Sequence, residues 1–282
     1  MLLAIDVGNT EATVGLFDGR RLARSFRLSS ETKRTADEVT LLVLQAFPDL
    51  SSRGDHAAVI ASVVPAATAI YVEAARRLTG HDPLEVSAAL PTGIEIEYRD
   101  PMAAGADRIA NAVAALRLYG APVIVVDFGT ATTFDVILKE RRYRGGVIAP
   151  GILTGAEQLV RRAARLSAFE LKRPDRVVGQ STEESLQSGV FYGAVGQVDA
   201  IVRRIAAEER IRPMVIATGG LAAVIAPYSE TIEKVDPDLT LHGLRLIHEE
   251  LATTSASSAP GAERGRTAAT RARPAKAKYR KR

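Results

Sequence analysis

Short apolar runs alternate along the chain with longer segments whose apolar positions repeat every three or four residues. Buried strands are predicted at residues 1–5, 57–64, 123–126 and 213–217. Helical spacing is found at residues 36–47, 67–78, 109–116, 154–165 and 186–205, and again at 242–251. Strands that alternate with helices in this way predict an α/β fold.

Two of the predicted strands end in the same pattern. Asp6 follows the first run, with Gly8 two residues later, and Asp127 follows the run 123–126, with Gly129 two residues later. Hydroxyl side chains and a second strand follow in both places. The two aspartates are 121 residues apart, which is about the length of one domain. The pattern therefore predicts a duplicated unit that presents a carboxylate and a glycine turn at a strand end, as an anion and metal site requires.

A third aspartate lies between these two units. Residues 98–108 lead through Gly105 into a segment of helical spacing, which places Asp107 and Arg108 at the start of a helix. An acidic residue at this position complements the helix dipole and can cap the helix. It could equally be a catalytic carboxylate, and the local sequence leaves both interpretations open.

The residue types present restrict the chemistry of any site. The chain has no cysteine, which excludes disulfides, thiolate metal sites and a cysteine nucleophile. Its four histidines are scattered without ligand spacing, and neither the P-loop nor the Rossmann glycine pattern occurs. Strand-end carboxylates and hydroxyl-rich turns remain, and these suit phosphoryl transfer with Mg²⁺ or K⁺.

Composition and charge bound the broad class of protein. The chain has 282 residues, of which 46% are hydrophobic and 25% charged, which suits two globular domains. No apolar run is long enough to span a membrane and no signal peptide pattern is present, so we expect a cytoplasmic protein. Nine Lys and Arg against one acid give residues 252–282 a net charge of +8, and residues 1–251 carry −4. We expect this tail to be disordered and to bind nucleic acid at most weakly.

Six short motifs follow one another between residue 1 and about residue 250. They are Asp6-Val7-Gly8-Asn9-Thr10, Gly105-Ala106-Asp107-Arg108, Asp127-Phe128-Gly129-Thr130-Ala131-Thr132-Thr133, Gly145-Gly146-Val147-Ile148-Ala149-Pro150-Gly151, Thr182 with Ser185-Leu186-Gln187-Ser188-Gly189, and Thr218-Gly219-Gly220. In order and spacing they resemble the type III pantothenate kinase family, in the superfamily of acetate and sugar kinases, heat-shock ATPases and actin. The resemblance implies two tandem ribonuclease H-like domains with an ATP cleft between them, here residues 1–117 and 118–251.

The resemblance also implies an activity and its cofactors. Members of the family phosphorylate pantothenate with ATP to 4′-phosphopantothenate, the first step of coenzyme A biosynthesis, as homodimers that need Mg²⁺ and a monovalent cation, K⁺ or NH₄⁺. Carried over by position, Asp107 is the expected general base. ATP is expected to bind to Asp6, Val7, Gly8, Asn9, Thr10, Glu11, Ala12, Thr13 and Thr130.

Metal and acceptor positions follow from the same resemblance. Asp6 is expected near Mg²⁺ and Asp127 at the monovalent cation. The pantothenate pocket is expected to be lined by Tyr98, Gly105, Ala106, Asp107, Arg108 and Thr182, with Thr182 reaching across the dimer. Three residues differ from those usual in the family and bear on substrate affinity more than on reaction type: Glu11, Asp100 and Ser181.

One alternative from another functional class stays open, an ATP-binding accessory regulator that has the fold without kinase activity. The presence of Asp6, Asp107, Arg108 and Asp127 together favours the enzyme. A protein that only binds nucleotide would need no base.

Overall fold

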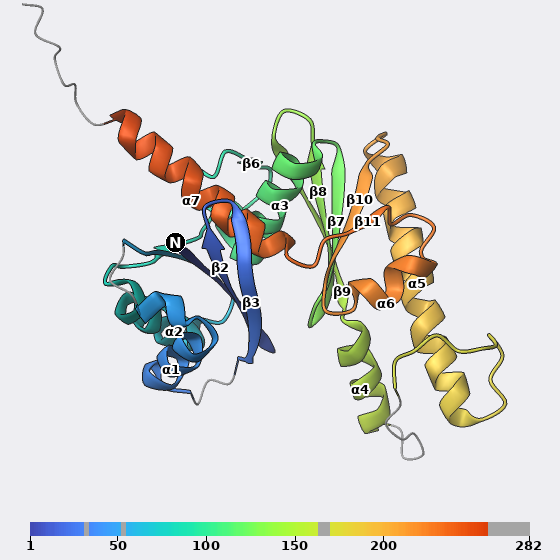
Figure 1. The fold of residues 1–282 in the computed structure, drawn as a ribbon. Helices are drawn as coiled ribbons and strands as arrows, with labels where there is room; N and C mark the ends of the chain where they lie inside the picture. Colours follow the sequence, from blue (N-terminus) through green and yellow to red (C-terminus); the bar gives the residue numbers. More distant parts are fainter. Residues whose placement is uncertain (31–33, 52–54, 163–169, 259–282) are drawn as a thin grey trace, which may run out of the picture.

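Two sheets with the same strand order form the centre of the protein (Figure 1). The computed structural model describes residues 1–30, 34–51, 55–162 and 170–258. The first sheet has the order β3-β2-β1-β4-β5. Its strands are β1 (Leu2–Val7), β2 (Glu11–Asp18), β3 (Arg21–Ser29), β4 (Ala57–Ser62) and β5 (Leu84–Glu85).

The second sheet repeats this arrangement with one addition. Its order is β11-β10-β7-β8-β9-β6, so β9-β8-β7-β10-β11 corresponds strand for strand to the first sheet. In both sheets the first two strands of the unit, β1 and β2 or β7 and β8, form an antiparallel hairpin. The first strand of each hairpin also pairs in parallel with a later strand, β1 with β4 and β7 with β10. The strands are β6 (Glu95–Ile96), β7 (Val123–Phe128), β8 (Ala131–Leu138), β9 (Arg142–Pro150), β10 (Met214–Gly219) and β11 (Lys234–Val235). The predicted duplication is therefore confirmed.

Helices cover both faces of each sheet, and two of them lie between the sheets (Figure 1). On the outer face of the first sheet lie α1 (Ala36–Ala46) and α2 (Pro65–Thr79). Between the sheets lie α3 (Ala106–Tyr119) and α7 (Leu239–Ser258). The outer face of the second sheet is covered by α5 (Thr182–Glu208) and α6 (Ala222–Ile225). A further helix, α4 (Ile152–Arg162), follows β9, and 3₁₀ turns occupy Pro48–Ser51, Pro101–Ala103 and Ala226–Tyr228.

The helix α7 comes last in the sequence but packs against the first sheet. It contacts α3, β1, β2 and β4, and Leu241, Leu244 and Ile247 belong to the apolar core between the sheets. A Cβ atom at Gly243 would lie 2.0 Å from the carbonyl oxygen of Ala110, so glycine is needed where α7 crosses α3. The helix ends at Ser258 rather than near residue 251, and residues 259–282 of the expected tail lie outside the described residues.

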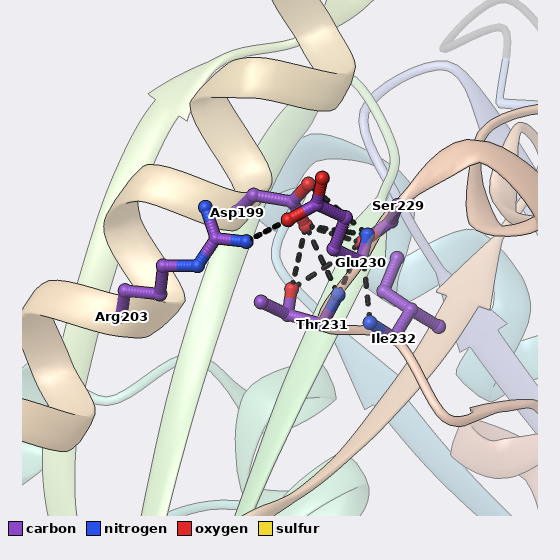
Figure 2. Close-up of polar contacts among 6 residues, drawn as sticks. All are labelled: Asp199, Arg203, Ser229, Glu230, Thr231 and Ile232. Atoms are coloured by element: carbon purple, nitrogen blue, oxygen red, sulfur yellow. Dashed lines mark hydrogen bonds and ion pairs between the residues drawn. The ribbon is translucent and has the colours of Figure 1, made fainter.

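The long helix α5 is fastened to the loop before β11 by one buried carboxylate. Asp199 accepts hydrogen bonds from the backbone N–H groups of Glu230 and Thr231 and from the hydroxyls of Ser229 and Thr231 (Figure 2). These hydrogen bonds lower the pKa of Asp199 despite its burial. Arg203, one turn further along α5, pairs with Glu230. This cluster, residues 199 and 229–231, fixes the outer layer of the second half.

The glycine-rich stretches serve purposes that their composition did not reveal. Residues 145–150 are part of β9 rather than a loop, and Gly151 lies against the backbone of the second glycine turn, where a Cβ would be 2.2 Å from the Thr130 carbonyl oxygen. Within α5, by contrast, a Cβ at Gly189, Gly193 or Gly196 would meet no atom within 4 Å among the described residues. No close packing at these three glycines is therefore found within the described part of one chain.

Among the described residues, no helix is both long enough and apolar enough to cross a membrane.

Candidate functional site

The carboxylates of the two repeated units occupy equivalent positions at the ends of β1 and β7. Asp6 is paired in register with Thr13 of β2, and Asp127 with Thr133 of β8. Each is followed by a tight turn, in which the N–H of Gly8 donates to the carbonyl of Glu11 at 3.0 Å and that of Gly129 to the carbonyl of Ala131 at 3.1 Å. The two turns therefore present their backbones in similar ways, as the sequence pattern predicts.

The two turns meet each other across the interface between the sheets. The hydroxyls of Thr10 and Thr130 lie 2.8 Å apart, although 120 residues separate them in the sequence. Both residues are exposed. Exposed hydroxyls and backbone groups from two facing turns are suited to hold the oxygens of a polyphosphate.

Asp107 lies in the first turn of α3, where the predicted helix begins. The N-cap residue is Gly105, so Asp107 is not itself the cap. One oxygen of its carboxylate, Oδ1, accepts the N–H of Arg108 at 2.7 Å. A Cβ at Gly105 would be 2.6 Å from this oxygen, so glycine is required for the carboxylate to fold back over the helix start.

These three aspartates form an electrostatically coupled cluster. Burial raises the pKa of Asp6 well above its usual range, and the neighbouring Asp107 and Asp127 raise it further. Burial also raises the pKa of Asp107, and the Arg108 N–H and guanidinium oppose that rise. The pKa of Asp127 is raised to about 7, chiefly by burial. Like charges gathered at a buried position require a compensating cation or a proton.

The two strand-end carboxylates have different partners. Oδ2 of Asp127 accepts a hydrogen bond from Nδ2 of Asn111 at 3.0 Å, and Oδ1 of the same asparagine accepts the hydroxyl of Thr240 at 2.7 Å. Oδ1 of Asp6 is buried and has no hydrogen-bond partner among the described residues. A buried oxygen without a partner is unusual in native proteins, and a bound ion or ligand at this place would satisfy it.

A separate buried cluster surrounds the Arg108 side chain. Its Nε donates to Oδ1 of Asp135 on β8 at 2.7 Å, and its Nη1 donates to the hydroxyl of Tyr98 at 2.7 Å. The hydroxyl of Tyr143 on β9 donates to the same Asp135 oxygen at 2.7 Å. Asp135 and Tyr143 are fully buried, and burial raises the pKa of Asp135 to about 6.

The remaining residues expected at the site are distributed unevenly. In the first turn, Val7 and Ala12 are buried while Asn9 and Glu11 are exposed, and Glu11 lies 3.5 Å from Arg27. Ala106 is buried in α3. Thr182 is the exposed first residue of α5, on the opposite face of the second sheet from α3. The fold therefore brings Asp107 together with both turns but does not direct Thr182 to the same face.

The sequence patterns do not indicate four residues that the fold places around the site: Asn111, Asp135, Tyr143 and Thr240. Asn111 lies four residues after Asp107, on the same face of α3, and this spacing could have indicated it. Asp135 stands in an otherwise apolar strand, which is a recognisable signal for a buried polar role. Tyr143 and Thr240 carry no comparable local signal, since the contacts of these two residues depend on tertiary packing.

An open cavity adjoins the start of α3. It has a volume of about 600 Å³ and is lined by residues at the end of β4 and along α2, among them Ser62, Val63 and Thr68. Val63 lies beside Gly105, with its Cγ1 3.6 Å from where a glycine Cβ would be. Among the described residues, no group of three or more Asp, Glu or His could hold a metal ion alone. A metal at this site would therefore need oxygens from a ligand or water, as Mg²⁺ commonly has.

Comparison with known proteins places this geometry in a family. The family model of type III pantothenate kinase matches residues 2–204. A type III pantothenate kinase from Moorella thermoacetica is 46% identical over 251 residues, which cover 88% of this chain and 99% of that protein. Another from Geobacter sulfurreducens is 45% identical over 251 residues, covering 88% and 98%.

Solved structures agree with this assignment at the level of the fold. A Campylobacter jejuni protein ascribed to the Baf family of transcriptional activators aligns with a TM-score of 0.54 and 20% identity, covering 89% of this chain and 99% of that one. A ROK hexokinase from Thermus thermophilus aligns with a TM-score of 0.51 and 15% identity, covering 89% and 99%. The two sheets are thus those of two ribonuclease H-like domains, and the chain belongs to the type III pantothenate kinase family.

Proposed function

We propose that the protein transfers the γ-phosphoryl group of ATP to the primary hydroxyl of pantothenate, giving 4′-phosphopantothenate for coenzyme A biosynthesis. Membership of the family supports the reaction. The observation that carries it is the convergence of Asp107, on a helix between the sheets, with two strand-end carboxylates whose turns meet at Thr10 and Thr130. A protein that only bound nucleotide would have no use for the third carboxylate.

Asp107 is the general base in this proposal. The N–H of Arg108 holds one carboxylate oxygen, Oδ1, and the other, Oδ2, accepts the proton of the attacking hydroxyl. Burial raises the pKa of Asp107, and a carboxylate with a raised pKa is a stronger base. Val63, which lines the cavity along β4 and α2, lies next to Gly105. Tyr98 and residues 105–108 line the acceptor pocket in this scheme.

The two turns hold the nucleotide. Residues 6–13 and Thr130 bind the phosphates of ATP through backbone N–H groups and hydroxyls. The family uses ATP with a divalent metal, and we take this metal to be Mg²⁺ beside Asp6. The buried oxygen of Asp6 without a partner fits such an ion. When bound, the ion neutralises charge on the transferred phosphoryl group.

Asp127 is assigned to a monovalent cation, K⁺ or NH₄⁺. Its second oxygen is already held by Asn111, and its pKa is raised to about 7 next to other carboxylates. A cation with carboxylate and carbonyl ligands would relieve this accumulation of negative charge. Gly219 leaves room for it, because a Cβ there would be 2.5 Å from Oδ1 of Asp127.

The working unit is proposed to be a homodimer. Gly189, Gly193 and Gly196 leave one side of α5 without a neighbour among the described residues. Large apolar side chains are exposed nearby along the chain on α4 and before α5, including Leu159, Val177 and Val178. A dimer through this surface would allow Thr182 to reach the acceptor pocket of the partner. Sedimentation should give a mass near twice the 30.1 kDa of the chain.

The proposed reaction is tested by a coupled assay of ADP release with purified protein, ATP and Mg²⁺, with and without pantothenate and K⁺. We expect ADP release that depends on pantothenate, with a product heavier than pantothenate by one phosphoryl group. Reactions without pantothenate measure background ATP hydrolysis. Absence of pantothenate-dependent release with every monovalent cation would contradict the proposal.

The basic tail is assigned no part in catalysis, and a cytoplasmic location stays a prediction. Residues 259–282 contain all nine Lys and Arg of residues 252–282. Removal of residues 259–282 should leave kinase turnover unchanged and abolish any salt-sensitive retention on DNA. Because α7 continues to Ser258, the truncation has to begin after that residue.

A further inference from the structure

The side chain of Arg108 is almost fully buried beside a carboxylate of the second sheet. Only 10% of the side chain is exposed, and that of Asp135 is not exposed at all. Nε and Nη2 of Arg108 both lie 2.7 Å from Oδ1 of Asp135. Nη1 is used by the hydroxyl of Tyr98. The positive charge is thus already balanced within the protein.

The strand β9 is shaped to admit this cluster. Gly146 is paired in register with Asp135. A Cβ at this position would lie 1.7 Å from the carbonyl oxygen of Phe134 and 2.8 Å from Nη2 of Arg108. At the neighbouring Gly145, a Cβ would lie 3.0 Å from the ring of Tyr98. The ring of Tyr98 in turn stacks on that of Tyr143 with centroids 5.6 Å apart. Two consecutive glycines therefore make space for the buried guanidinium and its aromatic neighbour.

The same arginine contacts the proposed base through its backbone. Its N–H donates to Oδ1 of Asp107 at 2.7 Å, while its side chain is fixed by Asp135. Arg108 therefore links a carboxylate of the second sheet to the carboxylate at the start of α3. A buried ion pair is a weak source of net stability, because the cost of desolvation offsets the attraction. Its main effect here is to fix the first turn of α3 in position and rotation.

We propose that Asp135 is a positioning residue for the reaction, which holds the guanidinium of Arg108 and thereby orients the carboxylate of Asp107 toward the acceptor hydroxyl. Tyr143 supports it by donating to the same oxygen of Asp135. The inference rests on the proposed function in so far as Asp107 is the base. In this arrangement Arg108 contacts Asp107 through its backbone N–H.

The test compares Asp135→Asn with the matched variant Asp199→Asn, since both remove the charge of a buried, hydrogen-bonded aspartate. Asp199 lies in the cluster with Ser229 and Thr231 on the outer face of the second sheet (Figure 2). We expect Asp135→Asn to lower kcat by about tenfold to a hundredfold, the cost of a misplaced catalytic group. KM for ATP should stay within about twofold, because both phosphate turns are intact. Asp199→Asn should lower the melting temperature and leave kcat unchanged.

Two further variants show whether Asp135 acts through Arg108. Tyr143→Phe removes only the hydroxyl that supports Asp135 and should lower kcat less than Asp135→Asn. The double variant Arg108→Gln with Asp135→Asn should lose no more activity than Arg108→Gln alone, since residues that act as one unit are not additive. The proposal would be overturned if the losses of kcat in the two single variants multiplied in the double variant. It would also be overturned if KM for ATP rose by the same factor as kcat fell.

Hydrogen exchange gives a readout that does not depend on turnover. In Asp135→Asn, amides of the peptide covering residues 105–112 should exchange faster, because the first turn of α3 is no longer held. In Asp199→Asn the faster exchange should instead appear at residues 229–232. Unchanged exchange at residues 105–112 in Asp135→Asn would overturn the inference. A wild-type protein without pantothenate-dependent turnover would contradict the proposed function, while the exchange result would still decide whether Asp135 holds this turn.

Discussion

The ends of β1 and β7 have the same backbone plan and different chemistry. Asp6 and Asp127 each pair with a threonine across a hairpin and each precede a glycine turn. Asp127, however, is held by Asn111, whereas one oxygen of Asp6 is buried with no partner among the described residues. A duplicated scaffold therefore supplies two equivalent carboxylates, and their surroundings give them separate tasks.

The difference between the two halves arises largely from one helix. Helix α3 lies between the sheets and carries Asp107 and Arg108 in its first turn and Asn111 in its second. Asn111 reaches the strand end of the second sheet, and Arg108 reaches Asp135 of the same sheet. No equivalent hydrogen bond to Asp6 is found among the described residues. A helix that belongs to one repeat thus completes the other.

The largest loss of turnover is expected at Asp107, which lies near the strand-end carboxylates of both halves. Asp107→Asn removes the proposed base and should lower kcat by roughly 10²–10⁴-fold, the usual contribution of general base catalysis. Fold and ATP binding should persist, because Gly105 rather than Asp107 occupies the N-cap. Steady-state kinetics with calorimetric titration of ATP would measure both. Near-wild-type turnover would show that Asp107 only stabilises the helix.

Exchanging the two strand-end carboxylates for asparagine should separate their tasks. We expect Asp6→Asn to raise the Mg²⁺ concentration needed for half-maximal turnover, and Asp127→Asn to raise that for K⁺, each by about tenfold to a hundredfold. Titrations of each ion at saturating amounts of the other would measure this. If either variant responded to both ions equally, the assignment of one ion to each half would be wrong.

The hydrogen bonds that distinguish Asp127 from Asp6 can be removed individually. Asn111→Ala leaves Asp127 without its donor, and Thr240→Val removes the hydroxyl that fixes the orientation of the Asn111 amide. We expect the K⁺ concentration needed for half-maximal turnover to rise by about tenfold in Asn111→Ala. In Thr240→Val it should rise less. The Mg²⁺ dependence serves as the internal control and should not change. An altered Mg²⁺ requirement would mean that Asn111 serves both halves.

A smaller effect is expected on the pH dependence of stability. The pKa of Asp127 is about 7 in the fold, against about 4 in an unfolded chain, so the native protein binds more protons between these values. The free energy of unfolding contributed by this group therefore falls as the pH rises from about 4 to about 7. In metal-free buffer, the melting temperature of Asp127→Asn should fall less over this range than that of the wild type. If the melting temperatures of the two proteins changed equally with pH, the raised pKa of Asp127 would be contradicted.

Local sequence patterns predicted the repeated unit, both strand-end aspartates and the position of Asp107 on a helix. Each of these depends on residues close together in the chain, such as Asp127 and Gly129. The Asp135–Arg108 pair was not predicted, because it depends on which helix enters the space between the sheets. Likewise, the division of the chain after residue 117 stays a prediction, while α7 packs against the first sheet from the far end of the sequence. Periodicity identifies elements without identifying their neighbours.

The position of α7 also restricts the order in which the protein can mature during synthesis. Leu241, Leu244 and Ile247 fill the core beside β1 and α3, and they leave the ribosome after every strand of both sheets has been made. The first repeat therefore cannot complete its interior while it is the only part translated. A fragment that ends before α7 should expose this apolar face and depend on chaperones. Packing of α7 is therefore the last step in assembling the site, although the residues of the site come mainly from the first half of the chain.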